Sequence, residues 1–163
     1  MSDKKKYKVL FLCTGNTARS VMGELLMERL GGGRFKTYSA GSHPKGVVNP
    51  YTIRVLEEEH EIDAGSANSE SWEVYKDVDF DFVITVCGHA KESCPVWPAD
   101  TIVAHWGSED PAAVEGSEEE IMKVFREVSW QIRRRVELFA ALPFDELDQA
   151  GLEERTKEIG SKP

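Results

Sequence analysis

The stretch Val-Leu-Phe-Leu-Cys-Thr-Gly-Asn-Thr-Ala-Arg-Ser, residues 9–20, decides the fold of this chain. An apolar run ends in Cys13, small or polar residues follow, and Arg19 and Ser20 open an amphipathic helix. A tight loop between a strand and a helix brings backbone N–H groups, the positive helix end and a guanidinium together, so we predict a cradle for a tetrahedral oxyanion. The same positive field is expected to lower the pKa of the Cys13 thiol and to activate it as a nucleophile. A plainer interpretation, a buried core cysteine and a surface arginine, explains the combination less well.

Strand and helix patterns alternate along the rest of the chain. Asn49-Pro50 is a helix start with asparagine as cap, and Ser117-x-x-Glu120 is a capping box. The predicted strands are residues 7–12, 35–40, 80–86 and 101–104, the predicted helices begin at 19, 50 and 118, and a short helix or turn is predicted at 72–75. This alternation predicts an α/β fold, a three-layer αβα sandwich with a four-stranded parallel sheet that binds ligands at the carboxyl ends of its strands.

Composition limits the domain count and the partners. The chain has 163 residues, and we expect a single catalytic domain over residues 1–143, followed by an acidic C-terminal tail or short helix over 144–163. The net charge of −9 argues against nucleic acid or an anionic membrane, and the run Arg133-Arg134-Arg135 is interpreted as the solvated end of a helix. Three cysteines and the lack of a long apolar run predict a cytoplasmic protein without a secreted disulfide framework, and we expect a monomer.

The Cys-x5-Arg-Ser pattern in this position resembles that of the low-molecular-weight tyrosine phosphatase superfamily. Within it, the chain looks most like the thioredoxin-coupled arsenate reductases, and the resemblance covers roughly residues 7–142. It implies arsenate or phosphate as the bound oxyanion. The residues that it places around that oxyanion are Cys13, Thr14, Gly15, Asn16, Thr17, Ala18, Arg19 and Ser20.

Two further cysteines distinguish between members of the superfamily. Cys87 ends a predicted strand, as Cys13 does, so loops at one sheet edge are able to bring the two together. Cys94 follows in a segment rich in glycine, serine and proline. In a helix these two sulfurs would lie roughly 10 Å apart, whereas a disulfide needs Cα atoms within roughly 7 Å, so we predict a mobile redox loop. The alternatives are two inert thiols, or a zinc site formed by Cys87, His89, Cys94 and His105.

The resemblance to the reductases implies a thiol relay. Cys13 attacks arsenate, Cys87 then attacks Cys13 and releases arsenite, and Cys94 attacks Cys87 and frees Cys13. Thioredoxin or a similar dithiol protein would reduce the final disulfide, and no tightly bound cofactor is expected. Some reductases of this type bind potassium, which would use Asn16, Glu24, Ser39 and Glu70 here, although many carry aspartate where this chain has Glu70.

Asp110-Pro111 follows the fourth predicted strand, and the superfamily places its general acid in such a pair. Glu109 is the nearest rival for this role. The alternative function is a low-molecular-weight protein tyrosine phosphatase. Such phosphatases usually carry a second cysteine where this chain has Ala18, and a tyrosine where it has Ala112.

Overall fold

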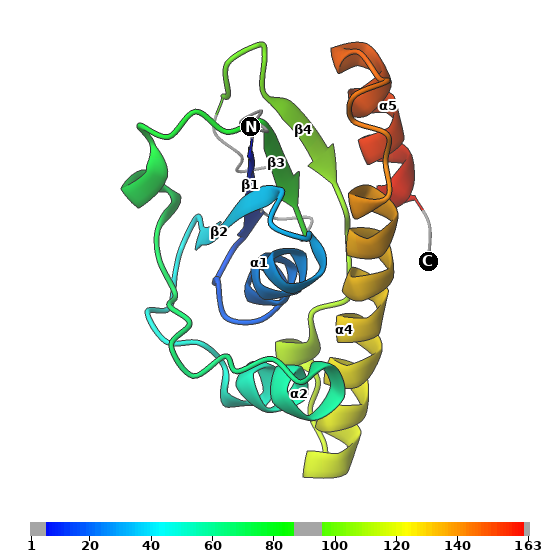
Figure 1. Cartoon of the computed structure of the whole chain (residues 1–163). Helices are drawn as coiled ribbons and strands as arrows, with labels where there is room; N and C mark the ends of the chain where they lie inside the picture. Colours follow the sequence, from blue (N-terminus) through cyan, green and yellow to red (C-terminus); the bar gives the residue numbers. More distant parts are fainter. Residues whose placement is uncertain (1–5, 87–95, 162–163) are drawn as a thin grey trace.

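The computed structural model describes residues 6–86 and 96–161. Four parallel strands form one sheet in the order β2-β1-β3-β4 (Figure 1). The strands are β1 (Tyr7–Cys13), β2 (Phe35–Gly41), β3 (Phe82–Thr85) and β4 (Ile102–His105). The predicted α/β fold with a four-stranded parallel sheet is confirmed. The predictions that involve Cys87, His89 and Cys94 lie outside the described residues.

The central strand β1 is buried on both faces from Val9 to Cys13, as its uninterrupted apolar run requires. Helix α1 (Arg19–Leu30) packs closely against it, because a Cβ atom on Gly23 would lie only 2.5 Å from Phe11 Cδ1. Gly32 and Gly33 then take positive φ angles of 63° and 80°, which turn the chain into β2. The close contact between Gly23 and Phe11 therefore holds α1 against β1, so the start of the helix lies next to the loop that follows Cys13.

Helices cover one face of the sheet. Helix α2 (Pro50–His60) begins at Asn49, whose Oδ1 accepts a hydrogen bond from Tyr51 N at 2.8 Å. Helix α4 (Glu118–Ala140) begins at the predicted capping box and packs against α1 and α2. The short 3₁₀ helix η1 (Trp72–Tyr75) packs beside β2, together with an aromatic group. That group is Tyr38, Tyr75, Phe80 and Trp97.

The C-terminal region forms the short helix that the sequence allowed. Helix α5 (Gln149–Gly160) lies beside β4 (Figure 1), and Trp106 Nε1 donates a hydrogen bond to Thr156 O at 2.9 Å. Phe144 packs its ring against Tyr7 and Phe139 in the main core. The division of the chain at residue 143 stays a prediction, but the residues on both sides of it share one core.

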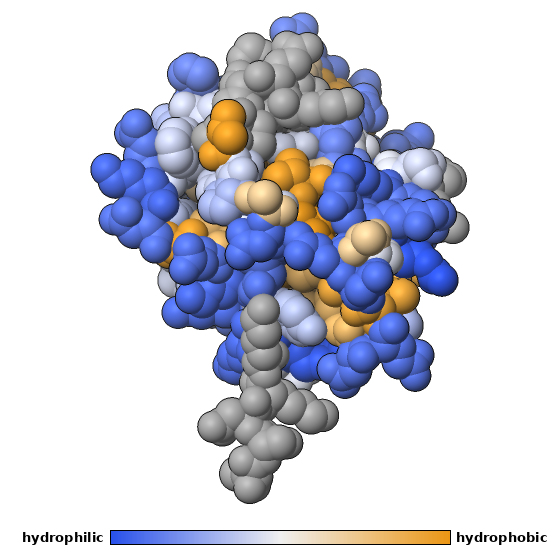
Figure 2. All heavy atoms as spheres, turned by 90° about the horizontal axis from the view of Figure 1, so that it is seen from above, coloured by the Kyte–Doolittle hydropathy of each residue, from blue (hydrophilic) through white to orange (hydrophobic). Residues whose placement is uncertain are grey.

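The surface agrees with the acidic composition. In the view of Figure 2 hydrophilic residues predominate, and apolar residues gather in a few small patches. No helix within residues 6–86 and 96–161 is long and apolar enough to cross a membrane.

Candidate active site

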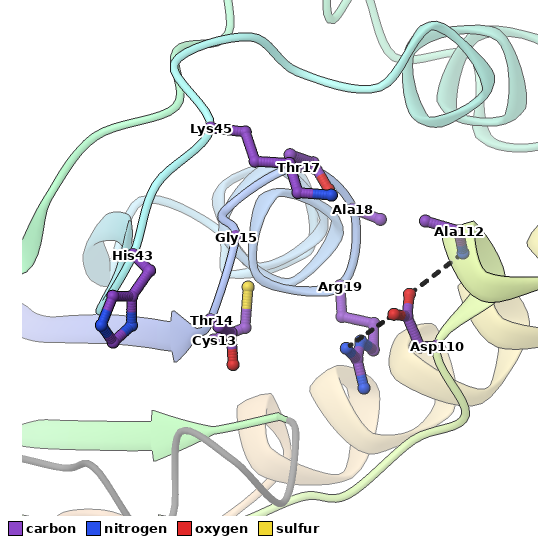
Figure 3. Close-up of a pocket in the computed structure, with 10 residues that line it drawn as sticks. All are labelled: Cys13, Thr14, Gly15, Thr17, Ala18, Arg19, His43, Lys45, Asp110 and Ala112. Carbon is purple, nitrogen blue, oxygen red and sulfur yellow. Dashed lines mark hydrogen bonds and ion pairs between the residues drawn. The ribbon is translucent and has the colours of Figure 1, made fainter.

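The loop between β1 and α1 folds back over the sulfur of Cys13. Asn16 takes a left-handed conformation with φ 50°, and its backbone N–H donates to Cys13 Sγ at 3.2 Å. Asparagine is one of the few non-glycine residues that adopt this conformation at low cost. The predicted tight loop is therefore present, with Cys13 at its base (Figure 3).

A chain of hydrogen bonds runs from the η1 region to the sulfur of Cys13. Glu70 N donates to Asn16 Oδ1 at 2.7 Å, which fixes the orientation of the amide, and Asn16 Nδ2 donates to Ser20 Oγ at 2.7 Å. Ser20 Oγ lies 2.9 Å from Cys13 Sγ. Since Ser20 Oγ already accepts from Asn16, its own proton is available to the sulfur. Asn16 and Ser20 are fully buried, so they support the loop from behind.

Arg19 and Asp110 lie next to each other across the mouth of the cradle (Figure 3). Arg19 Nη1 donates to Ser108 O at 2.8 Å, and Arg19 Nη2 lies 3.7 Å from Asp110 Oδ2. The Asp110 side chain is 46% exposed, and its Oδ1 accepts from Ala112 N at 3.0 Å, at the start of the short helix η2 (Pro111–Ala113). The predicted general acid therefore faces the predicted oxyanion-binding arginine. Glu109 is exposed and is not among the residues that line the cavity.

A cavity of about 570 Å³ opens above Cys13. Of the predicted oxyanion-binding residues, those that line it are Cys13, Thr14, Gly15, Thr17, Ala18 and Arg19. His43 and Lys45 line it as well, and the sequence did not single them out. A signal for them existed, because they follow the carboxyl end of β2, next to β1. Backbone hydrogen bonds from His43 N to Thr14 O and from Lys45 N to Gly15 O hold this segment against the loop.

The residues predicted to hold potassium are brought together only in part. Ser39 Oγ donates to Glu24 Oε1 at 2.6 Å, and the hydroxyl of Tyr75 donates to Glu70 Oε2. These four side chains line a cavity of about 230 Å³, whereas Asn16 does not line it. Burial raises the pKa of Glu24 from its ordinary value of 4.5 to about 7, and burial with the Glu70 hydrogen bond raises the pKa of Tyr75.

The oxygen donors suit a hard cation, which would favour the charged form of Glu24. In the part of the chain that the structure describes, no three or more histidine, cysteine or acidic side chains are placed to hold a metal ion. Of the alternative zinc ligands only His105 is described, and its Nδ1 lies 2.8 Å from Thr85 Oγ1. Both metal sites therefore remain predictions.

Comparisons with known proteins agree with this geometry. The low molecular weight phosphotyrosine protein phosphatase family matches residues 8–152. An arsenate reductase of Oceanobacillus iheyensis is 40% identical over 134 residues, which are 81% of this chain and 94% of that protein.

Solved structures show the same fold. A crystal structure of arsenate reductase from Archaeoglobus fulgidus superposes with a TM-score of 0.67 at 32% identity, over 82% of this chain and 99% of that one. A thioredoxin-dependent arsenate reductase of Corynebacterium glutamicum superposes with a TM-score of 0.59 at 25% identity, over 82% of this chain and 61% of that one. The chain belongs to the low molecular weight phosphotyrosine protein phosphatase family.

Proposed function

We propose that the protein is an arsenate reductase in which Cys13 is the nucleophile, Arg19 binds the oxyanion and Asp110 is the general acid. The observation that carries this proposal is the placement of Cys13 Sγ at the base of a cavity whose mouth holds the Arg19–Asp110 pair. The relatives named arsenate reductase support the choice of substrate. The cavity lining also supports it, because Ala112 lines the cavity at the position after Asp110-Pro111 where phosphatases of the superfamily usually carry a tyrosine.

The first step forms a bond between sulfur and arsenic. Arsenate oxygens accept hydrogen bonds from the N–H groups of the loop and from the Arg19 guanidinium, which offers two parallel donors. The hydrogen bonds from Asn16 N and Ser20 stabilise the thiolate of Cys13, which attacks arsenic. Asp110 donates its proton to a hydroxyl group of arsenate, and this group leaves as water when its bond to arsenic breaks.

The second step moves two electrons to arsenic. The thiolate of Cys87 attacks Cys13 Sγ, a disulfide forms, and the sulfur–arsenic bond breaks with its electron pair on arsenic, so arsenate leaves as arsenite. Val86 N donates to Leu12 O at 3.0 Å, so the residue before Cys87 is paired next to Cys13. Cys94 then attacks Cys87, which frees Cys13 and leaves a Cys87–Cys94 disulfide.

Thioredoxin is the proposed electron donor. The chain carries its own third thiol, and the structural relative from Corynebacterium glutamicum is described as thioredoxin-dependent. Glu24, Ser39 and Glu70 would hold a potassium ion, and a bound cation there would supply positive charge beside the Glu70–Asn16–Ser20 hydrogen bonds. A tyrosine phosphatase is the alternative, since the oxyanion cradle serves either reaction.

A coupled assay tests the proposal. Enzyme, arsenate, thioredoxin, thioredoxin reductase and NADPH should consume NADPH, and Cys13→Ser, Cys87→Ser and Cys94→Ser should each stop turnover. Peptide mass mapping after one turnover should find Cys13–Cys87 or Cys87–Cys94 disulfides. Hydrolysis of phosphotyrosine that needs Cys13 but neither Cys87 nor Cys94, without arsenate-dependent NADPH consumption, would establish the phosphatase instead.

A further inference from the structure

The arginine run in α4 is not the uniformly solvated helix end that the sequence predicted. Arg134 is exposed, but Arg135 retains only 4% of its accessible surface. The prediction was wrong for Arg135, because the helical period points it toward the sheet edge while Arg134 faces solvent. A buried guanidinium is costly unless its donors are satisfied, so its hydrogen-bond partners indicate what it does.

The partners of Arg135 among the described residues belong to two segments that are distant in sequence. Arg135 Nη1 donates to Gly107 O at 2.9 Å and lies 3.3 Å from Ser108 Oγ. Arg135 Nη2 donates to Gly160 O at 3.3 Å. One guanidinium therefore joins α4, the last residue of α5 and the segment 106–110, which we call the acid loop because it ends in Asp110.

We propose that Arg135 is a positioning residue that fixes the acid loop. Helix α5 in turn holds the Arg135 guanidinium in place. The inference rests on the proposed role of Asp110. Ser108, held by Arg135 through its side chain, accepts the Arg19 hydrogen bond through its carbonyl oxygen. The acid loop is thus held from one side by the oxyanion-binding arginine and from the other by Arg135.

Helix α5 is fitted closely to the start of the acid loop. A Cβ atom on Gly160 would overlap the carbonyl oxygen of His105 and lie 2.9 Å from Trp106 Cδ1. The indole of Trp106 donates to Thr156 O, one turn earlier in the same helix. These contacts fix the position of Gly160 O, which accepts a hydrogen bond from Arg135 Nη2. The family match ends at residue 152, so most of α5 lies beyond it.

The geometry needs a guanidinium rather than a simple positive charge. The three acceptors among the described residues lie in two segments and match the planar fork of arginine, whereas the ammonium of a lysine, on a shorter side chain, cannot reach all of them. Arg135→Lys should therefore recover only part of the function, and Arg135→Met, with a similar apolar stem, should lose it. Arg134→Met is the matched control, because it removes the same group from the exposed neighbour.

The test measures arsenite formed in a single turnover, with the full-length enzyme in excess over arsenate. Arg135→Met should lower the maximal rate at least tenfold. A general acid typically raises the reaction rate about a hundredfold or more, and a displaced acid loses much of this effect. The enzyme concentration that gives half-maximal rate should change less than about threefold, because the loop and α1 that carry Arg19 are intact. Arg134→Met should change neither quantity.

A double-mutant cycle separates positioning from general loss of structure. In the Asp110→Asn background, Arg135→Met should slow the reaction less than about threefold, because the group that it positions is already gone. Equal factors in both backgrounds would overturn the proposal. Gly160→Ala, which displaces α5, should show the same dependence on Asp110, and the exposed substitution Glu154→Ala is its control. If Arg135→Met does not fold, the Gly160→Ala result tests the proposal in its place.

Hydrogen exchange of the backbone amides tests the role of Arg135 independently of the proposed reductase activity. Without arsenate, the amides of residues 107–110 should exchange faster in Arg135→Met than in Arg134→Met. If the wild-type enzyme forms no arsenite, the proposed function fails, yet the exchange result still decides whether Arg135 fixes the acid loop. Unchanged exchange together with an unchanged single-turnover rate would overturn the inference.

Discussion

Ser20 Oγ lies 2.9 Å from Cys13 Sγ while it accepts a hydrogen bond from Asn16 Nδ2. This relationship leaves the Ser20 proton available to the sulfur, and a thiolate of Cys13 would accept it. A hydrogen bond to a charged group contributes roughly 1.5–3 kcal/mol, which is enough to change reactivity measurably.

Ser20→Ala is therefore expected to slow the alkylation of Cys13 by iodoacetamide at pH 7 by about tenfold, since less of the thiol is ionised. The measurement is the second-order rate of labelling at Cys13, followed by peptide mass spectrometry. Ser161→Ala, at the far end of α5, is the control and should label at the wild-type rate. An unchanged rate in Ser20→Ala would show that the hydroxyl does not donate to the sulfur.

Asp110→Asn should slow arsenite formation in a single turnover by about a hundredfold or more, because an amide cannot release the proton that the departing oxygen needs. Stability should change little, since the Arg19–Asp110 pair is long and the carboxylate is half-exposed. Glu109→Gln is the matched control and should stay within about twofold of the wild-type rate. The reverse ranking of these two variants would move the acid role to Glu109.

Glu24 predicts a pH dependence of stability. Burial raises its pKa to about 7, whereas the unfolded chain releases the same proton near its ordinary value of 4.5. Between these values the folded state binds more protons, so this group lowers the free energy of unfolding as the pH rises, by about 3 kcal/mol once both states are ionised.

Urea unfolding at pH 5 and pH 8 measures this effect. Glu24→Gln should lose less stability over this interval than the wild-type protein, with exposed Glu57→Gln as the control. The proposed potassium site adds a second expectation: potassium should stabilise the wild-type protein at pH 8 and leave Glu24→Gln unaffected. Identical pH dependence in Glu24→Gln and the wild type would show that the buried carboxyl does not titrate near pH 7.

The parts of the fold and of the site that could be predicted depend on local sequence patterns. The strand ending at Cys13, the Asn49 cap and the Ser117 cap depend on neighbours within a few residues, and the structure contains all of them. The tight loop between Cys13 and Arg19 was predictable for the same reason, because both residues lie within seven consecutive positions.

Features that depend on tertiary docking were not predictable from these patterns. The helical period places Arg135 on the inner face of α4 and Arg134 on the outer face, but it does not show that α5 and the acid loop close over Arg135. The bond from Glu70 N to Asn16 Oδ1 joins residues 54 positions apart. Lys45 reaches the cavity because backbone pairing lays the segment after β2 along the loop after β1.

Lys45 should attract the substrate to the cavity. The chain carries a net charge of −9, so an oxyanion is repelled overall, and the exposed Lys45 side chain lies over Gly15 at the rim. One charge at about 4 Å in water is worth about 1 kcal/mol, so Lys45→Gln should raise the half-saturating arsenate concentration in the coupled assay about fivefold at low salt. The maximal rate should stay unchanged, because Lys45 makes no contact with the acid loop that the structure records.

The dependence on salt concentration distinguishes electrostatic attraction by Lys45 from a change in the shape of the cavity caused by the substitution. The difference between Lys45→Gln and wild type should shrink as ionic strength rises from about 0.01 M to about 0.5 M, since screening weakens attraction at an exposed site. Lys123→Gln, an exposed substitution of the same charge on α4, is the control and should leave the half-saturating concentration unchanged. If Lys123→Gln has the same effect as Lys45→Gln, the net charge of the protein governs arsenate binding, and the position of Lys45 at the rim does not.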